Sequence, residues 1–240
     1  MLKVDFHTHT ADDPADPIPY QTHELIDRAA TLGFDAIAIT LHDRQLDLRP
    51  FERHAASRGV VLIPGVERTI AGRHVLLLNF SDAAERIQSF EDLARLKQRE
   101  GGLVIAPHPF FPARSALRGA LRRHPELFDA VEWNAMFTRH VNFNAAAERW
   151  ATRHGKPMVG NGDVHRLEQL GTTYSLVDAS REPRAICEAI AAGRVQVVAT
   201  PLTFVHASSL MARLVASMFV RRPQPDPGSR IPDPGPDPAY

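Results

Sequence analysis

The first residues of the chain alternate between apolar and polar side chains. In the segment LKVDFH, which starts at Leu2, every second residue is apolar. This two-residue period is typical of a β-strand with one buried face. On such a strand, His7 and His9 lie on the same side about 6–7 Å apart, because each residue advances the strand by about 3.3 Å. Two imidazoles at one strand end can share a metal ion, and a pair of solvated surface histidines is the alternative.

Strand-like and helix-like segments then alternate through most of the chain. Further strands are predicted at 35–40, 60–65, 74–80, 103–109, 130–134, 157–163, 172–177 and 195–200. Helices are predicted at 22–32, 50–58, 90–100, 115–124, 144–154 and 182–193. Several of these strands are almost entirely apolar, as in parallel sheets that are buried on both faces. The alternation predicts an α/β protein with a parallel sheet, either open or closed into a barrel.

The C-terminal part of the chain has a different pattern. After a domain that spans residues 1–203, the segment SLMARLVASMFV places apolar residues at helical spacing and predicts an amphipathic helix over 204–221. That helix either packs on the domain or binds a partner or a membrane surface. Residues 222–240 are rich in proline, aspartate and glycine, which predicts a disordered or polyproline tail.

Composition narrows the class of protein. Lys and Arg together number 28, as do Asp and Glu, so the formal net charge is zero and a broad cationic surface for duplex nucleic acid is not expected. The single cysteine, Cys187, cannot form an internal disulfide, which favours a reducing compartment. We see no secretion signal before the first strand, and no apolar run reaches the ~20 residues that span a bilayer. We therefore expect a cytoplasmic protein without a transmembrane segment.

Histidine and carboxylate side chains follow five of the predicted strands. Because active sites of parallel α/β folds form where the carboxyl ends of the strands meet, we expect these side chains to converge. Burying so many polar groups without a shared ligand would be costly. Histidine with Asp and Glu, and without Cys, fits Zn²⁺, Mn²⁺ or Fe²⁺, and carboxylates can bridge two ions. The candidates are His7, His9, Asp12, Asp13, His42, Asp43, Glu67, His108, Asp163 and His165.

The ordered motifs DFHTHT, AITLHD, PGVE, APHP and GNGDVH resemble those of the polymerase and histidinol phosphatase (PHP) family over roughly residues 1–200. The resemblance implies a distorted seven-stranded β/α barrel of the TIM-like type, with two or three divalent metal ions. It also implies a substrate-facing role for His74. Position by position, it implies that the first metal is bound by His7, His9, Glu67 and Asp163. Glu67 would bridge to a second metal that also uses His108. A third metal would be bound by Asp13, His42 and His165.

The chain departs from the family pattern at three places. Leu41 stands where the family commonly has Asp, and an acidic residue follows the histidine instead. The segment ADDPADP replaces the usual Ser-Asp-Gly, so the choice of Asp13 over Asp12 depends on the alignment. Asn134 stands where some relatives have a histidine of the second metal site.

The favoured hypothesis is a metal-dependent phosphoesterase that acts on a small phosphorylated metabolite or nucleotide. Its cations would hold the phosphate oxygens and lower the pKa of a bridging water, with Glu67 and Asp163 as the catalytic carboxylates. Arg44 and Arg114 follow two of the motifs and are candidates for binding the phosphate. An amidohydrolase-type C–N hydrolase is one alternative. Such enzymes often place a carboxylated lysine between two metals, but no lysine lies at a predicted strand end. A metal-binding scaffold without catalytic activity is the other.

Overall fold

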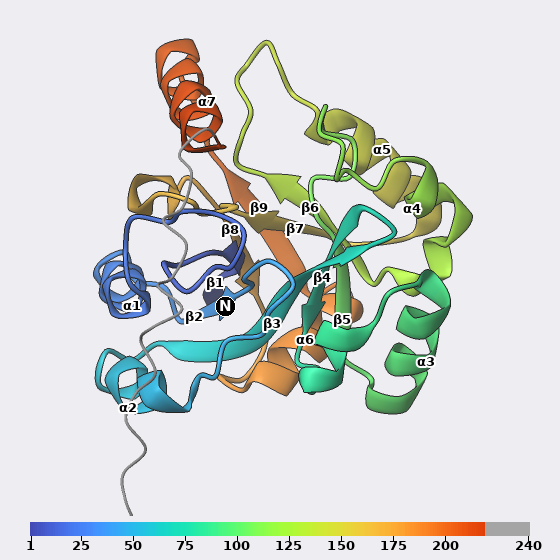
Figure 1. Ribbon diagram of the computed structural model, residues 1–240, viewed down its shortest axis with the longest axis horizontal. Helices are drawn as coiled ribbons and strands as arrows, with labels where there is room; N and C mark the ends of the chain where they lie inside the picture. Colours follow the sequence, from blue (N-terminus) through green and yellow to red (C-terminus); the bar gives the residue numbers. More distant parts are fainter. Residues whose placement is uncertain (219–240) are drawn as a thin grey trace, which may run out of the picture.

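The computed structural model describes residues 1–218 and has one curved sheet at its centre (Figure 1). The strands follow the order β7-β6-β5-β4-β3-β2-β1-β8-β9 across the sheet. Their bounds are β1 Leu2–Thr8, β2 Ala36–Ile39, β3 Val61–Ile70, β4 Arg73–Leu78, β5 Leu103–Ala106, β6 Ala130–Asn134, β7 Met158–Asn161, β8 Thr173–Val177 and β9 Val195–Ala199.

The sheet is mixed and nearly closes into a barrel. Strands β4 and β8 pair antiparallel with their neighbours, and the other pairs are parallel. At the seam, the Gly160 amide of β7 donates to Ser175 Oγ of β8 over 2.9 Å, and this hydroxyl lies 3.1 Å from Gly160 O, to which it donates. The predicted barrel is therefore confirmed, with nine strands in place of the seven that the resemblance implies. The predicted parallel sheet is wrong for β4, because Ala71 and Gly72, both at positive φ, join β3 to β4 in a tight hairpin.

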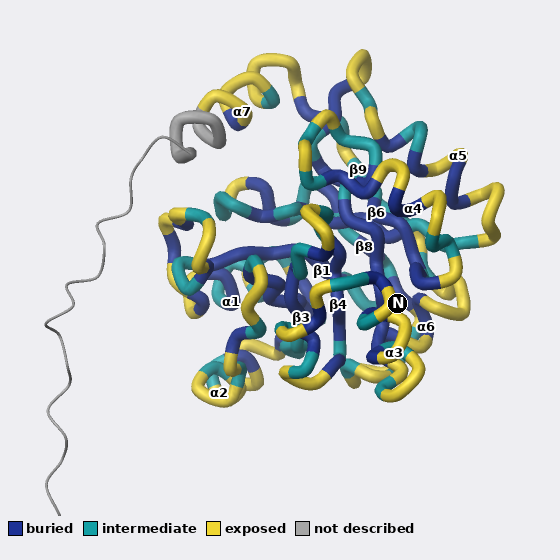
Figure 2. Tube along the Cα trace, turned by 45° about the vertical axis from the view of Figure 1, so that its right-hand side comes forward, coloured by how far each residue is buried: buried dark blue, intermediate teal, exposed yellow. Residues whose placement is uncertain are grey.

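Helices surround the sheet, so that the buried positions concentrate on the strands (Figure 2). Helix α3 shows how local sequence sets the bounds: Ser89 and Asp92 form a capping box at its start, and Gly101 ends it in the left-handed conformation. The predicted helix at 115–124 is shorter, since α4 begins only at Gly119. The bounds are α1 Thr22–Thr31, α2 Arg49–Ser57, α3 Phe90–Glu100, α4 Gly119–Arg123, α5 Asn144–His154, α6 Pro183–Ala191 and α7 Phe204–Met218, with 3₁₀ turns η1 Asp82–Arg86, η2 Pro125–Leu127 and η3 Leu167–Gln169.

Helix α6 packs at one end of the barrel. Its residues Ile186 and Ile190 belong to the same apolar cluster as Val4, Phe6 and Leu76 of the sheet. Leu2, Val61 and Val195, all at the amino ends of strands, pack against this cluster. The carboxyl ends of the parallel strands point to the opposite end of the barrel, where the polar candidates lie.

Strand β3 is longer than predicted, and this changes the setting of Glu67. The sequence indicates a turn at Pro64-Gly65 and a loop beyond it, but β3 continues to Ile70. Gly65 is needed for close packing, since a Cβ there would lie 2.7 Å from Leu78 Cδ2 and 2.9 Å from Thr40 Cγ2. Glu67 is therefore held within a paired strand and not in a loop.

The segment after β9 returns to the polar end of the barrel before α7 begins. The amide of Leu202 donates to Phe137 O over 2.9 Å, which attaches the start of α7 to the segment after β6. Leu210 of α7 is buried. No helix within residues 1–218 is both long and apolar enough to cross a membrane. The predicted proline-rich tail at 222–240 lies outside the described residues.

Candidate metal centre

His7 lies on β1 and His9 follows directly after it, and the structure brings their rings together. The ring centroids are 5.2 Å apart, and both side chains are fully buried. Their Nε2 atoms lie 3.2 Å and 3.4 Å from Glu67 Oε2. Neither Nε2 atom has the geometry of a hydrogen bond to any described residue. Two buried nitrogens without hydrogen-bond partners thus face the same carboxylate, which is the arrangement expected of metal ligands.

Glu67 lies at the middle of the cluster. A parallel bridge between His42 and Glu67 extends the pairing of β2 with β3 and holds His42 Nε2 3.2 Å from Glu67 Oε2. The other oxygen, Oε1, accepts from His74 Nδ1 at 2.6 Å and lies 3.2 Å from His108 Nε2. Although burial disfavours the charged form, His7 and His74 hold the pKa of the Glu67 carboxyl well below its usual range. Each oxygen of one ionised carboxylate therefore faces a different set of imidazoles.

Asp13 orients two of these histidines. Its Oδ2 atom accepts hydrogen bonds from His9 Nδ1 at 2.8 Å and from His42 Nδ1 at 2.9 Å. Burial opposes ionisation, but these two hydrogen bonds keep the pKa of the Asp13 carboxyl far below its usual value. A protonated Nδ1 leaves Nε2 of the same ring free to bind a metal. The neighbouring Asp12 instead accepts from the hydroxyls of Thr10 and Thr22.

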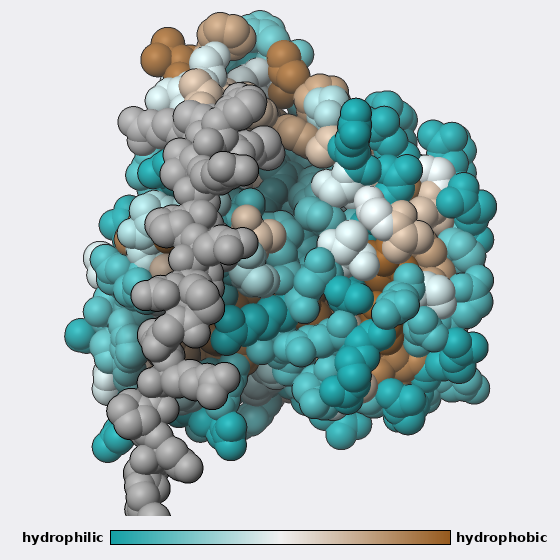
Figure 3. All heavy atoms as spheres, in the orientation of Figure 1, coloured by the Kyte–Doolittle hydropathy of each residue, from teal (hydrophilic) through white to brown (hydrophobic). Residues whose placement is uncertain are grey.

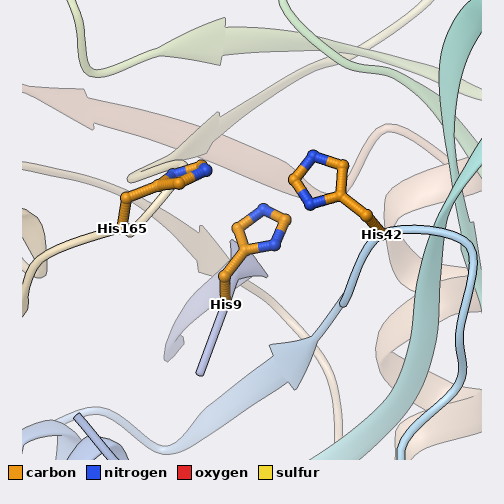
Figure 4. Close-up of side chains that lie close together, drawn as sticks. All are labelled: His9, His42 and His165. Atoms are coloured by element: carbon orange, nitrogen blue, oxygen red, sulfur yellow. The ribbon is translucent and has the colours of Figure 1, made fainter. Parts of the chain in front are cut away.

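Three histidines from separate segments of the chain face one another in Figure 4. The ring of His9 lies 4.5 Å from that of His42 and 4.4 Å from that of His165, measured between centroids. One nitrogen from each ring lies within 4.8 Å of the others, so the three could bind one ion. His165 Nε2 also lies 3.0 Å from Asp16 Oδ2. Hydrogen bonding to Asp16 raises the pKa of His165 in spite of the burial that would lower it.

Asp163 and His108 complete the cluster on its other side. Asp163 Oδ1 lies 3.4 Å from His7 Nε2, and ligand atoms of His7, His108 and Asp163 lie within 4.8 Å of one another. Burial raises the pKa of Asp163, but His7 and His165 outweigh it and keep the carboxyl ionised. Two further groups meet the same distance condition: His7 with His9 and Glu67, and His42 with Glu67 and His74. These overlapping groups share ligands, as in sites that hold more than one ion.

Three further residues belong to the site: Glu132 and Asp16, which the sequence interpretation missed, and Asn134, which it noted only as a departure from the family pattern. Glu132 on β6 is fully buried and accepts from His7 Nδ1 at 2.9 Å. Asn134 Nδ2 donates to Glu132 Oε1 at 2.7 Å and to Asp163 Oδ2 at 3.1 Å. Asp16 is the partner of His165. The signal for Glu132 was a charged residue inside the apolar strand AVEWN; the sequence offers no comparable signal for Asp16.

The cluster opens into a cavity of about 580 Å³. Arg114 and His74, two of the candidates for substrate binding, line this cavity. Arg44 does not line it and places its Nη1 atom 3.4 Å from the carbonyl oxygen of Asp12. The lining residues are Asp16, His42, Glu67, His74, His108, Phe111, Pro112, Ala113, Arg114, Ser115, Asn134, Met136, Gly162, Asp163, His165, Gln169 and Met211.

Comparison with known proteins agrees with this fold. Residues 141–195 match the family model PHP_C, described as PHP-associated, whereas no curated protein matches. A two-domain protein from Bacteroides vulgatus containing a predicted PHP-like metal-dependent phosphoesterase is 24% identical, with a TM-score of 0.64 over 82% of this chain and 64% of that one. PsfC from Pseudomonas syringae is 18% identical, with a TM-score of 0.61 over 90% of this chain and 97% of that one. This chain thus spans less than two thirds of the first protein. Residues 141–195 are thus similar to a PHP-associated segment, and the fold is similar to that of a PHP-like protein.

The expectation that duplex nucleic acid is not a partner, which was based on the net charge, is wrong. The complex of Endonuclease Q with a 27-mer duplex carrying an abasic lesion at the active site is similar in structure, with 16% identity and a TM-score of 0.55 over 88% of this chain and 67% of that one. A protein of this fold therefore binds duplex DNA. A net charge of zero does not exclude such a partner, because net charge does not describe the local field around a site.

Proposed function

We propose that the protein is a metal-dependent phosphoesterase. The observation that carries the proposal is the convergence of imidazoles and carboxylates on Glu67, with Nε2 of His7 and His9 buried and without hydrogen-bond partners among the described residues. The name of the similar B. vulgatus protein supports the same reaction class, since it denotes hydrolysis of phosphoester bonds. Histidine with carboxylate ligands, and no cysteine at the site, fits Mn²⁺, Zn²⁺ or Fe²⁺.

We assign the ligands to two or three ions, with Glu67 shared between the first and the second. Such ions would supply Lewis-acid polarisation of phosphoryl oxygens and a lowered pKa for water. The assignment gives His7, His9, Glu67 and Asp163 to the first ion, Glu67 and His108 to the second, and His42 and His165, with Asp13, to the third.

The chain's own residues hold these ligands in place and bind the substrate. Asp13 and Glu132 accept hydrogen bonds from Nδ1 of the ligand histidines and so present the Nε2 atoms to the ions. Arg114 brings a positive charge to the cavity, where a phosphate would be stabilised. We assign His74 and Arg114 to substrate binding, and Arg44 to a more peripheral contact.

The dimensions of the cavity support a small phosphorylated metabolite or nucleotide. Its volume of about 580 Å³ lies within the range of small-molecule sites. A lesion-bearing duplex belongs in the same assay, because the similar Endonuclease Q binds one.

The test uses Glu67→Gln in the manganese-loaded protein with an aryl phosphate as substrate. The neutral amide cannot serve two cations, so we expect turnover to fall by about a hundredfold or more and metal content to fall with it. Circular dichroism should show that the fold is kept, because Gln is nearly isosteric with Glu. Glu126→Gln, at an exposed position on η2, is the matched control and should behave as the wild type. Wild-type turnover and metal content in Glu67→Gln would contradict the proposal.

The amidohydrolase and scaffold alternatives are separated by the same assay. No lysine lines the described part of the cavity, so the carboxylated lysine that often links two metals in amidohydrolases has no counterpart there. Hydrolysis of an amide but of no phosphoester would favour the C–N hydrolase. Bound metal without any turnover would favour the scaffold.

A further inference from the structure

The cavity above the metal centre has two chemically different groups of lining residues. One group consists of the histidines and carboxylates described above. The other group is apolar, and exposed carbon atoms make up most of the lining of the cavity as a whole. We call this group the apolar wall; it consists of Phe111, Pro112, Ala113, Met136 and Met211.

The apolar wall is held in place by contacts with neighbouring residues. The amide of Phe111 donates to His108 O over 3.0 Å, and Arg118 Nη2 donates to Phe111 O over 3.2 Å. The Phe111 ring packs edge-on against Phe143, with centroids 5.3 Å apart. The amide of Met136 donates to Asn134 Oδ1 over 2.8 Å. These contacts hold Phe111 and Met136 in position without a bound ligand.

Helix α7 supplies the last member of the wall. Leu210 is 3% exposed, which holds the helix against the barrel, and the next residue, Met211, reaches the cavity. Figure 3 shows hydrophobic residues gathered over α7, whereas most of the remaining surface in that view is hydrophilic. Phe204 and Val205, at 75% and 78% exposure, belong to this helix but do not line the cavity.

The chemistry of the wall selects the group that could lie on it. Hydroxyls or charges placed against Phe111, Met136 and Met211 would lose water without gaining hydrogen bonds. An aromatic ring loses little water and gains ring–ring contacts with Phe111 and sulfur–ring contacts with the methionines. A phosphate alone would not use this wall, since its negative charge favours contact with the cations of the metal centre.

We propose that the apolar wall binds an aromatic group attached to the phosphate of the substrate, with Phe111 and Met211 as its specificity-determining residues. This inference rests on the proposed function for the position of the phosphate. It places the aryl or heteroaryl part of the phosphoester between the loop after β5 and helix α7.

Binding of two phosphonates tests the inference without requiring turnover. Phenylphosphonate and methylphosphonate share the group that would face the metals and differ only in the ring. We expect the manganese-loaded wild type to bind phenylphosphonate about tenfold more tightly in calorimetry. Phe111→Ala and Met211→Ala should remove most of this preference and leave methylphosphonate affinity within about twofold.

Two controls and a separate assay keep the outcomes distinct. Met211→Leu, which keeps the apolar volume, should retain most of the preference, and Val205→Ala on the outer side of α7 should retain all of it. Equal affinity of the wild type for both phosphonates, or equal losses for both in the variants, would overturn the inference. If the preference is present but phenyl phosphate is not hydrolysed, the proposed function fails and the apolar wall stands. If phenyl phosphate is hydrolysed but the wild type shows no preference for phenylphosphonate, the proposed function stands and the inference about the apolar wall fails.

Discussion

At the scale of single residues, two adjacent aspartates take different partners. Asp13 accepts hydrogen bonds from two ligand histidines, whereas Asp12 accepts from threonine hydroxyls. The sequence alone could not separate them, because the motif in which they stand departs from the family pattern. The backbone separates them: the amide of Asp13 donates to Thr10 O in a tight turn, which points only one of the two carboxylates at the rings.

This difference gives a matched pair of variants, Asp13→Asn and Asp12→Asn. In Asp13→Asn, one neutral amide oxygen replaces the carboxylate that orients His9 and His42, so we expect metal affinity to fall by about 10- to 100-fold. In Asp12→Asn, an amide oxygen can still accept from a hydroxyl, and affinity should stay within about twofold. Titration of the metal-free variants with Mn²⁺ in a calorimeter measures both. Equal losses in the two variants would show that Asp13 has no special role.

At the scale of elements, all nine strands could be located from the sequence, but not all their directions. Apolar runs marked most of the strands because burial on both faces requires them, and alternation marked β1. The direction of β4 depends on the Ala71-Gly72 hairpin, and that of β8 on its antiparallel pairing with β1, which the alternation of strands and helices does not encode. The extent of β3 was missed for a related reason: Pro64-Gly65 is typical of a turn, and only the packing against Leu78 shows why glycine stands in a strand.

The seam between β7 and β8 leads to a prediction for Gly160→Ala. A Cβ at this position would lie 2.5 Å from Tyr174 O and 3.1 Å from Val197 Cγ1, so backbone atoms would have to move. We expect a loss of about 1–3 kcal/mol in the free energy of unfolding, measured by urea denaturation. Gly119→Ala is the control, since its Cβ would meet only the flexible end of Arg123 at 3.3 Å, and its change should stay within about 0.5 kcal/mol. Equal stability of the two variants would mean that β7 and β8 can separate without cost.

At the scale of the whole molecule, the candidate centre depends on closure of the barrel. Its side chains come from β1, β3 and β4 and from the segments after β1, β2, β5 and β7, which are far apart in the sequence. The strand-end rule located most of them, because each parallel strand delivers its carboxyl end to the same rim. Glu132 escaped that rule since it lies within a strand, and its partner His7 is 125 positions away. Pairings of this kind depend on tertiary structure.

A ligand held by so many segments should stabilise the entire fold. An ion that binds the native state and not the unfolded chain adds about 2.7 kcal/mol when its concentration is a hundred times its dissociation constant. For a chain of this length, each kcal/mol raises the melting temperature by about 2–4 °C, so we expect Mn²⁺ to raise it by about 5–10 °C over protein treated with EDTA. His42→Ala, which removes one imidazole from two of the ligand groups, should lose part of this shift. His54→Ala, which removes a histidine on α2 that pairs with Asp27, should keep it in full. A melting temperature in the wild type that does not respond to Mn²⁺ or Zn²⁺ would contradict metal binding by this cluster.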